Sequence, residues 1–212
     1  MTTSADIIAI QLAVIRTSNS VDAALIADRV NLGTLTIPDY IGSLINQATN
    51  STKPALIVAN YVEGVVPVTA RVDSLAAFSL AQYSYGAGTG VANPLLYAYQ
   101  ALGAAFSATT QFATKIAGLT LEQLITTTYL DSLGVTPTAA QVAHFVSQYT
   151  YFYNLYVGAG LTTAAADTQA KGAVVGQILY YGANTPGSSF ATKVNTWLYN
   201  AGSGTAAYGV AL

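Results

Sequence analysis

The stretch that decides the fold occurs twice, as GVVPVTARVDSL at residues 64–75 and as GVTPTAAQVAHF at residues 134–145. Each copy follows a short segment that carries a tyrosine, Tyr61 or Tyr129. Glycine is favoured just past the end of a helix and proline in the first helical turn. Each copy therefore predicts a helix, a tight turn and a second helix. Because one such unit cannot bury its apolar face alone, the two must pack together or against other helices.

Helical signals continue on both sides of this internal helix-turn-helix repeat. The clearest amphipathic stripe runs from Val142 to Tyr156, with apolar residues three and four positions apart. Thr120 and Gln123 predict a capping box. Asn-Gly and Asp-Gly hairpin signals are absent from the sequence. C-terminal caps are expected at Gly33, Gly118 and Gly182, and helix starts at Pro38, Pro54, Pro67, Pro94, Pro137 and Pro186.

These signals predict an all-α protein, a multi-helix bundle of about ten short and medium antiparallel helices. The expected helices lie near residues 4–16, 20–31, 38–49, 54–63, 67–85, 94–106, 120–132, 137–157, 162–181 and 186–200. We expect a single helical domain over residues 1–208, with a subdomain boundary near 86–93, where three glycines favour a hinge. Residues 201–212, rich in Gly and Ala, are expected to form a loosely held tail leading to further C-terminal regions.

The composition narrows the class of protein. Charged residues make up only 8% of the 212 residues, whereas a typical domain is about one-quarter charged. The chain has 15 tyrosines, one histidine and no cysteine. Its surface must therefore be built from Thr, Ser, Asn, Gln, Tyr and Ala. Such a neutral surface suits packing against other copies or lying along a sugar polymer, which indicates an extracellular structural or binding protein.

Several other classes are disfavoured. The seven basic residues are scattered, so the clustered footprint of a nucleic-acid binder or of a protein attached to anionic lipid is missing. The uncharged stretch between Asp73 and Lys115 is broken by polar residues and glycines, so we expect no transmembrane segment. The first residues lack the basic region of a secretory signal peptide. An export signal is therefore expected elsewhere, in a C-terminal portion.

The Gly-x-x-Pro turn followed by an Ala-rich helix resembles helical repeats of bacterial surface proteins exported by type I secretion. A closer likeness is to the N-terminal domain of Caulobacter-type surface-layer (S-layer) proteins, whose Gly-Val-x-Pro helix start looks like Gly64–Pro67. The similarity extends through 97–106 to 171–179 and covers most of residues 25–208. The repeats of that group usually carry Arg directly after the glycine and Asp directly after the proline. In this chain Val65 and Val135 stand in place of the Arg, and Val68 and Thr138 stand in place of the Asp.

The resemblance implies an all-helical domain that grips the O-antigen polysaccharide of lipopolysaccharide and anchors a secreted protein on the outer-membrane exterior. It also implies a calcium-binding, lattice-forming β-rich portion after this domain. Because these repeat positions differ from those of the group, the resemblance supports the all-helical fold. It does not identify sugar-binding residues in this chain.

Sugar recognition by this chain would use tyrosine and tryptophan faces flanked by neutral hydrogen-bonding groups. Candidate clusters contain Tyr83 and Tyr85, the tyrosines of 149–156, Tyr180 and Tyr181, and Trp197. The carbohydrate-binding residues that we predict are those off the strongest apolar stripe or near loops: Tyr85, Tyr151, Asn154 and Trp197.

Catalysis is disfavoured, because His144 has no second histidine or cysteine beside it and the carboxylates are dispersed. The same inventory predicts no metal site and no cofactor, although calcium held by one aspartate and loop carbonyls stays open. We expect a non-enzymatic anchoring domain that binds O-antigen. Two alternatives remain: the cell-attachment domain of a large biofilm adhesin, and a protein–protein assembly module that self-associates through its tyrosines.

Overall fold

The computed structural model describes residues 1–211 and is all-helical over that range, as the sequence predicts. Its elements are α1 (Ser4–Ile15), α2 (Ser20–Asn31), α3 (Ile37–Gln47), η1 (Ala48–Asn50), α4 (Thr52–Glu63), α5 (Thr69–Gly88), α6 (Pro94–Phe106), α7 (Thr110–Ile116), α8 (Leu121–Leu133), α9 (Ala139–Gly158), α10 (Thr163–Asn184) and α11 (Ser189–Gly202). No helix among the described residues is both long enough and apolar enough to cross a membrane.

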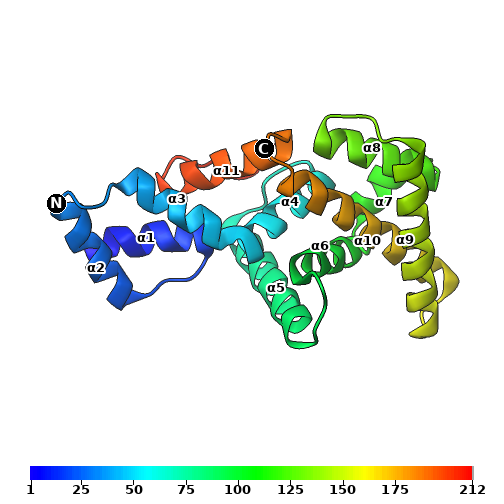
Figure 1. Ribbon diagram of the computed structural model, residues 1–212, viewed down its shortest axis with the longest axis horizontal. Helices are drawn as coiled ribbons and strands as arrows, with labels where there is room; N and C mark the ends of the chain where they lie inside the picture. Colours follow the sequence, from blue (N-terminus) through cyan, green and yellow to red (C-terminus); the bar gives the residue numbers. More distant parts are fainter. Residues whose placement is uncertain (212) are drawn as a thin grey trace.

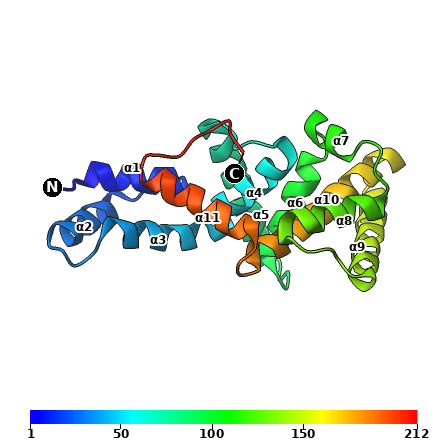
Figure 2. The same cartoon turned by 90° about the horizontal axis from the view of Figure 1, so that it is seen from above.

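The helices form an elongated molecule with three regions along its long axis (Figure 1). One end is built from α1, α2 and α3, against which α11 packs. The middle contains α4, α5, α6 and α10, and the other end contains α7, α8 and α9. The view from above shows the segment after α11 running back over the molecule toward α4 (Figure 2).

The predicted repeat is present and is longer than the sequence pattern indicated. Gly64 ends α4 and Gly134 ends α8, and both have a φ of 76°, the left-handed conformation that glycine adopts without strain. The helix that follows has 20 residues in each case. We call α4, α5 and α6 the first unit and α8, α9 and α10 the second unit; they are offset by about 70 positions.

The two units meet where α6 crosses α10. A Cβ atom built on Gly103 would clash with the carbonyl oxygen of Gly172, and a Cβ built on Gly172 would clash with the carbonyl oxygen of Gly103. This reciprocity means that the two backbones touch at the crossing, with no room for a side chain on either helix. The position needs glycine for close approach rather than for its conformational freedom.

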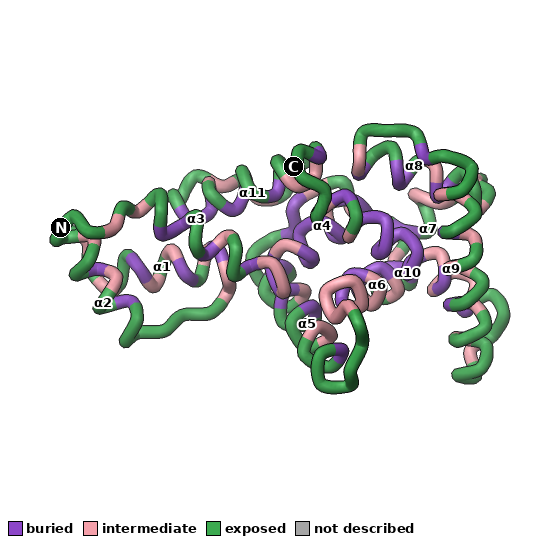
Figure 3. Tube along the Cα trace, in the orientation of Figure 1, coloured by how far each residue is buried: buried purple, intermediate pink, exposed green. Residues whose placement is uncertain are grey.

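Helix α10 lies between the two parts of the core (Figure 3). Val175 and Leu179 face the larger cluster, which α1–α8 and α11 also build. Val174 and Ile178, one residue earlier in each case, face the smaller cluster of the second unit. Because neighbouring residues of a helix point about 100° apart, a helix that is apolar all round can serve both clusters.

Several sequence-based boundaries were wrong. Helix α7 was not predicted, and with it the described chain has eleven α-helices, in agreement with the expected number of about ten. Pro67, Pro137 and Pro186 precede helices that begin at Thr69, Ala139 and Ser189. The hydroxyls of Thr138 and Ser188 accept hydrogen bonds from backbone N–H groups of the first turn, and this capping fixes the start after the proline.

Two glycines predicted as breaks lie inside helices. Helix α5 continues through Gly86 to Gly88, because Gly86 is buried against Pro94 and Tyr97 of α6. Gly182 lies inside α10, packed against the backbone of Ser132, and does not cap a helix. In both cases close packing with another helix explains the glycine, and the local sequence cannot show this.

The tail after Asn200 is held rather than loose. The backbone N–H of Val66 donates to the carbonyl of Val210 at 2.7 Å, and that of Gly209 donates to the carbonyl of Val66 at 2.8 Å. The Tyr208 hydroxyl accepts a hydrogen bond from Arg16 at 3.2 Å. The tail thereby covers the turn of the first unit.

Candidate functional site

Five tyrosines from three helices form a row that spans both units, and we call it the tyrosine row: Tyr85 of α5, Tyr97 of α6, and Tyr156, Tyr153 and Tyr149 of α9. The rings of Tyr85 and Tyr97 have centroids 6.0 Å apart, as have those of Tyr149 and Tyr153. Tyr156 lies one turn from Tyr153 on α9 and stacks on Phe152 with ring centroids 6.4 Å apart, and its phenol interacts electrostatically with that of Tyr97 in the first unit.

The row presents partly accessible, uncharged rings. Tyr85 is 59% exposed, and the other four are half-buried. Burial, and after it the neighbouring Tyr85 phenol, raises the pKa of Tyr97; burial and the Tyr97 phenol raise the pKa of Tyr156. These phenols therefore stay protonated at neutral pH, and each offers a ring face and a hydroxyl.

An ion pair between Asp167 and Lys171 lies beside Tyr149, at the end of the row. Tyr149 donates its hydroxyl hydrogen to Asp167 at 2.7 Å, and the same carboxylate accepts from Lys171 at 2.9 Å. Burial opposes ionisation of Asp167, but the hydrogen bonds from Lys171 and Tyr149 outweigh it and hold the pKa of that carboxyl below its usual range. The charges of Asp167 and Lys171 balance, so the row remains neutral overall.

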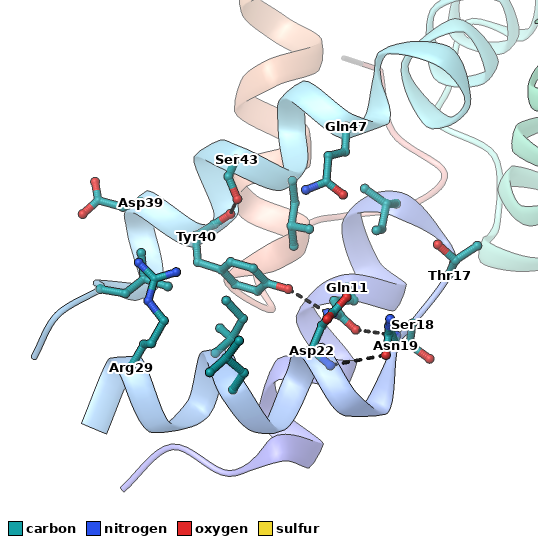
Figure 4. A pocket seen from close by; sticks show the side chains of 15 residues that line it. Gln11, Thr17, Ser18, Asn19, Asp22, Arg29, Asp39, Tyr40, Ser43 and Gln47 are labelled. Atoms are coloured by element: carbon teal, nitrogen blue, oxygen red, sulfur yellow. Dashed lines mark hydrogen bonds between the residues drawn. The ribbon is translucent and has the colours of Figure 1, made fainter. Parts of the chain in front are cut away.

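A polar cleft lies at the opposite end of the molecule, between α2 and α3, which both pack on α1 (Figure 4). Its volume is about 570 Å³, within the usual range for small-molecule sites. Tyr40 and Gln11 lie at its base and are nearly fully buried. Asp22, Arg29 and Asp39 lie around it. No sequence motif pointed to this cleft, because the residues come from three helices and share no spacing.

A smaller hollow of about 400 Å³ lies in the second unit, between α8, α9 and α10. Phe145 is central to it, with ring centroids 6.1 Å from both Tyr129 and Tyr181 in edge-to-face contact. Gln141 donates a hydrogen bond to the Tyr129 hydroxyl at 2.7 Å, and His144 is exposed at the rim. The aromatic packing of this hollow explains His144 as a surface residue beside Phe145.

The predicted sugar-binding residues do not form one site. Tyr85 lies in the tyrosine row. Tyr151 and Asn154 are exposed, and Tyr151 is about 200° around α9 from Tyr149, so it faces away from the row. Trp197 is only 7% exposed and is part of the larger core, which contradicts its predicted role.

The burial of Trp197 has a specific cause. Its indole N–H donates to the carbonyl of Ala207 at 2.8 Å, and its ring meets Tyr208 edge-on with centroids 5.3 Å apart. Both partners belong to the tail, which the sequence analysis expected to be loose. Tyr97 was missed as a site residue, because a tyrosine at helical spacing gives no signal of what another helix places beside it.

Within residues 1–211, no group of three or more His, Cys, Asp or Glu side chains is arranged to hold a metal ion.

No protein-family model and no curated protein matches this chain. Its function must be argued from the arrangement of its own side chains.

Proposed function

We propose that this chain is a non-enzymatic cell-surface anchoring domain that binds the O-antigen polysaccharide of lipopolysaccharide along the tyrosine row. The observation that carries the proposal is the row itself, which has one pair of neighbouring neutral rings on α5 and α6 and another on α9. The resemblance to surface-layer anchoring domains names the polymer, and the low charge of the chain fits a neutral ligand.

The chemistry of the row suits a polysaccharide. Pyranose rings carry apolar C–H patches that stack on aromatic faces, and phenol hydroxyls exchange hydrogen bonds with sugar hydroxyls. Each such contact is weak. A polymer that touches several rings, and several copies of the protein on one cell, gain strength by effective concentration rather than through one tight pocket. Binding to neutral rings should also depend little on salt.

The test is co-sedimentation with smooth lipopolysaccharide and with rough lipopolysaccharide that lacks O-antigen. We expect the protein to sediment with the smooth form only, at low and at high salt. Tyr85→Ala should weaken binding by about fivefold or more, because it removes one ring worth roughly 1 kcal/mol. Equal binding to both forms, or binding to neither, would contradict the proposal.

Two exposed tyrosines outside the row serve as matched controls. Tyr151, on the outer face of α9, is 60% exposed, and Tyr199, on α11, is 40% exposed. Tyr151→Ala and Tyr199→Ala remove similar rings and should leave binding unchanged. If Tyr151→Ala weakens binding and Tyr85→Ala does not, the polymer binds the outer face of α9, where Asn154 also lies, and the row is the wrong site.

A second candidate function is protein–protein assembly, for which α2 gives a specific observation. Val21 and Leu25 of α2 are 77% and 60% exposed, and Leu32, the residue directly after the helix, is 77% exposed. Large aliphatic side chains gathered on one helix are frequent in interaction surfaces. Concentration-dependent oligomers in light scattering without sugar, abolished by Leu25→Ser, would favour this function, whereas a monomer at all concentrations would disfavour it.

A further inference from the structure

The polar cleft between α2 and α3 contains a hydrogen-bonded relay at its base (Figure 4). The backbone N–H of Asn19 donates to Gln11 Oε1 at 3.0 Å, and Gln11 Nε2 donates to the Tyr40 hydroxyl oxygen at 2.8 Å. Gln11 is 4% exposed and Tyr40 is 6% exposed. The relay therefore fixes the positions of two buried side chains on different helices.

The relay leaves one buried donor unused. Because the Tyr40 oxygen accepts from Gln11, its own O–H hydrogen points elsewhere, and no acceptor for it is found among residues 1–211. Burial raises the pKa of Tyr40, the hydrogen bond from Gln11 opposes that rise, and Asp22 adds to it. The phenol stays protonated, so its O–H hydrogen is available to a ligand acceptor that enters the cleft in place of solvent.

The walls supply complementary groups. Asp22 lies near enough to affect Tyr40, and its carboxylate has no donor within the described chain. Leu25, Ile26 and Leu44 provide an apolar surface in the same cleft. The cleft thus combines a fixed donor, a free two-oxygen acceptor and an aliphatic wall.

We infer that this cleft is a second binding site, which takes a single hydroxyl-rich ring, such as a sugar at a chain end or on a side branch. Neighbouring hydroxyls of such a ring donate to the two oxygens of Asp22. One ring oxygen or hydroxyl oxygen accepts from Tyr40, and the C–H face lies on the aliphatic wall. The inference rests on the proposed function only for the sugar class, since the site shares no residue with the tyrosine row.

The test is saturation-transfer NMR on the full chain with the methyl glycosides of glucose, galactose, mannose and N-acetylglucosamine. We expect transfer to at least one glycoside. Tyr40→Phe keeps the ring and removes the hydroxyl, so it should weaken binding about fivefold or more. Asp22→Asn keeps the shape and removes the charged acceptor, so it should weaken binding about tenfold. Circular dichroism spectra and thermal midpoints of both variants confirm that the fold is kept.

The outcomes separate this inference from the proposed function. If the cleft binds the glycoside, Tyr85→Ala leaves the transfer unchanged, whatever it does to polymer binding. If the protein fails to sediment with smooth lipopolysaccharide but the glycoside binds and Tyr40→Phe weakens it, the proposed function fails and the inference stands. No transfer to any of the four glycosides, or transfer that Tyr40→Phe and Asp22→Asn leave intact, overturns the inference.

Discussion

The first and second units follow the same backbone path and have different surroundings. Val66 of the first unit is fully buried, because residues 209 and 210 of the tail pair with its backbone. At the equivalent turn of the second unit, Thr136 is exposed and Val135 is 55% exposed. A repeat pattern fixes the helix–turn–helix, whereas what covers each copy depends on distant parts of the chain.

Matched positions also carry different chemistry. Arg71 at the start of α5 pairs with Glu63 and lies over the ring of Phe106 at 5.5 Å. Its counterpart Gln141 completes a capping box with Thr138 and reaches Tyr129. Matched positions of the two units therefore contact different partners.

The largest expected effect comes from breaking the contact between the units. Gly103→Ala places a methyl group against the backbone of α10, which cannot move away without separating α6 from α10. We expect a loss of about 3 kcal/mol or more in the free energy of unfolding. This corresponds to a fall of roughly 6–12 °C in thermal midpoint, measured by circular dichroism.

The control is Gly42→Ala on α3, where an added Cβ meets nothing within 4 Å. Because alanine favours the helix, this change should stabilise the protein by about 0.5–1 kcal/mol. Similar effects of Gly103→Ala and Gly42→Ala would show that the helix crossing is not tight.

The next effect comes from uncovering the first unit. Tyr208→Ala removes the hydrogen bond from Arg16 and the edge contact with Trp197. We expect a loss of about 2 kcal/mol, because a half-buried aromatic side chain is removed. Trp197 is the only tryptophan in the chain, so its fluorescence should shift to the red if the tail loosens. Unchanged emission in this variant would contradict the described packing of the tail.

A smaller effect tests whether the two turns are equivalent. Gly64→Ala and Gly134→Ala each force alanine into a left-handed conformation, with a φ of 76° at both sites. Each should cost about 1 kcal/mol in urea unfolding. A difference between the two variants beyond the experimental error would show that the tail changes the cost of strain in the turn that it covers.

The smallest effect concerns Asp167 of α10. Because its folded pKa lies below the unfolded value, Asp167 stabilises the protein above about pH 4, and this contribution is lost as the pH falls through the folded pKa. Its side chain is 38% exposed, so the contribution should stay below about 1 kcal/mol.

Asp167→Asn should therefore reduce the difference in urea midpoint between about pH 7 and about pH 3 relative to the parent protein. Asp6 also has a lowered pKa, through hydrogen bonds from the Thr3 backbone and side chain, and it contributes equally to both proteins. If parent and variant lose the same stability on acidification, the bonds from Tyr149 and Lys171 do not hold the Asp167 carboxylate.

The sequence predicted correctly those features that depend on interactions between residues close together in the chain. The capping box of Thr120 and Gln123 was predicted and is present, since both partners lie within one helical turn. The burial of Trp197 was not predicted, because it depends on tail residues that carry no recognisable pattern.

The sequence alone determined the helices, the repeat and the neutral character of the surface, because capping, periodicity and composition act over a few residues. Only the tertiary structure decided that Gly103 and Gly172 touch, that Tyr97 of α6 lies beside Tyr85 of α5, and that Gln11 and Tyr40 share a cleft. Those outcomes depend on which helices cross and at what distance. Burial of apolar surface drives that choice, and since burial has no direction, the residues in contact are set by the packing of the whole chain.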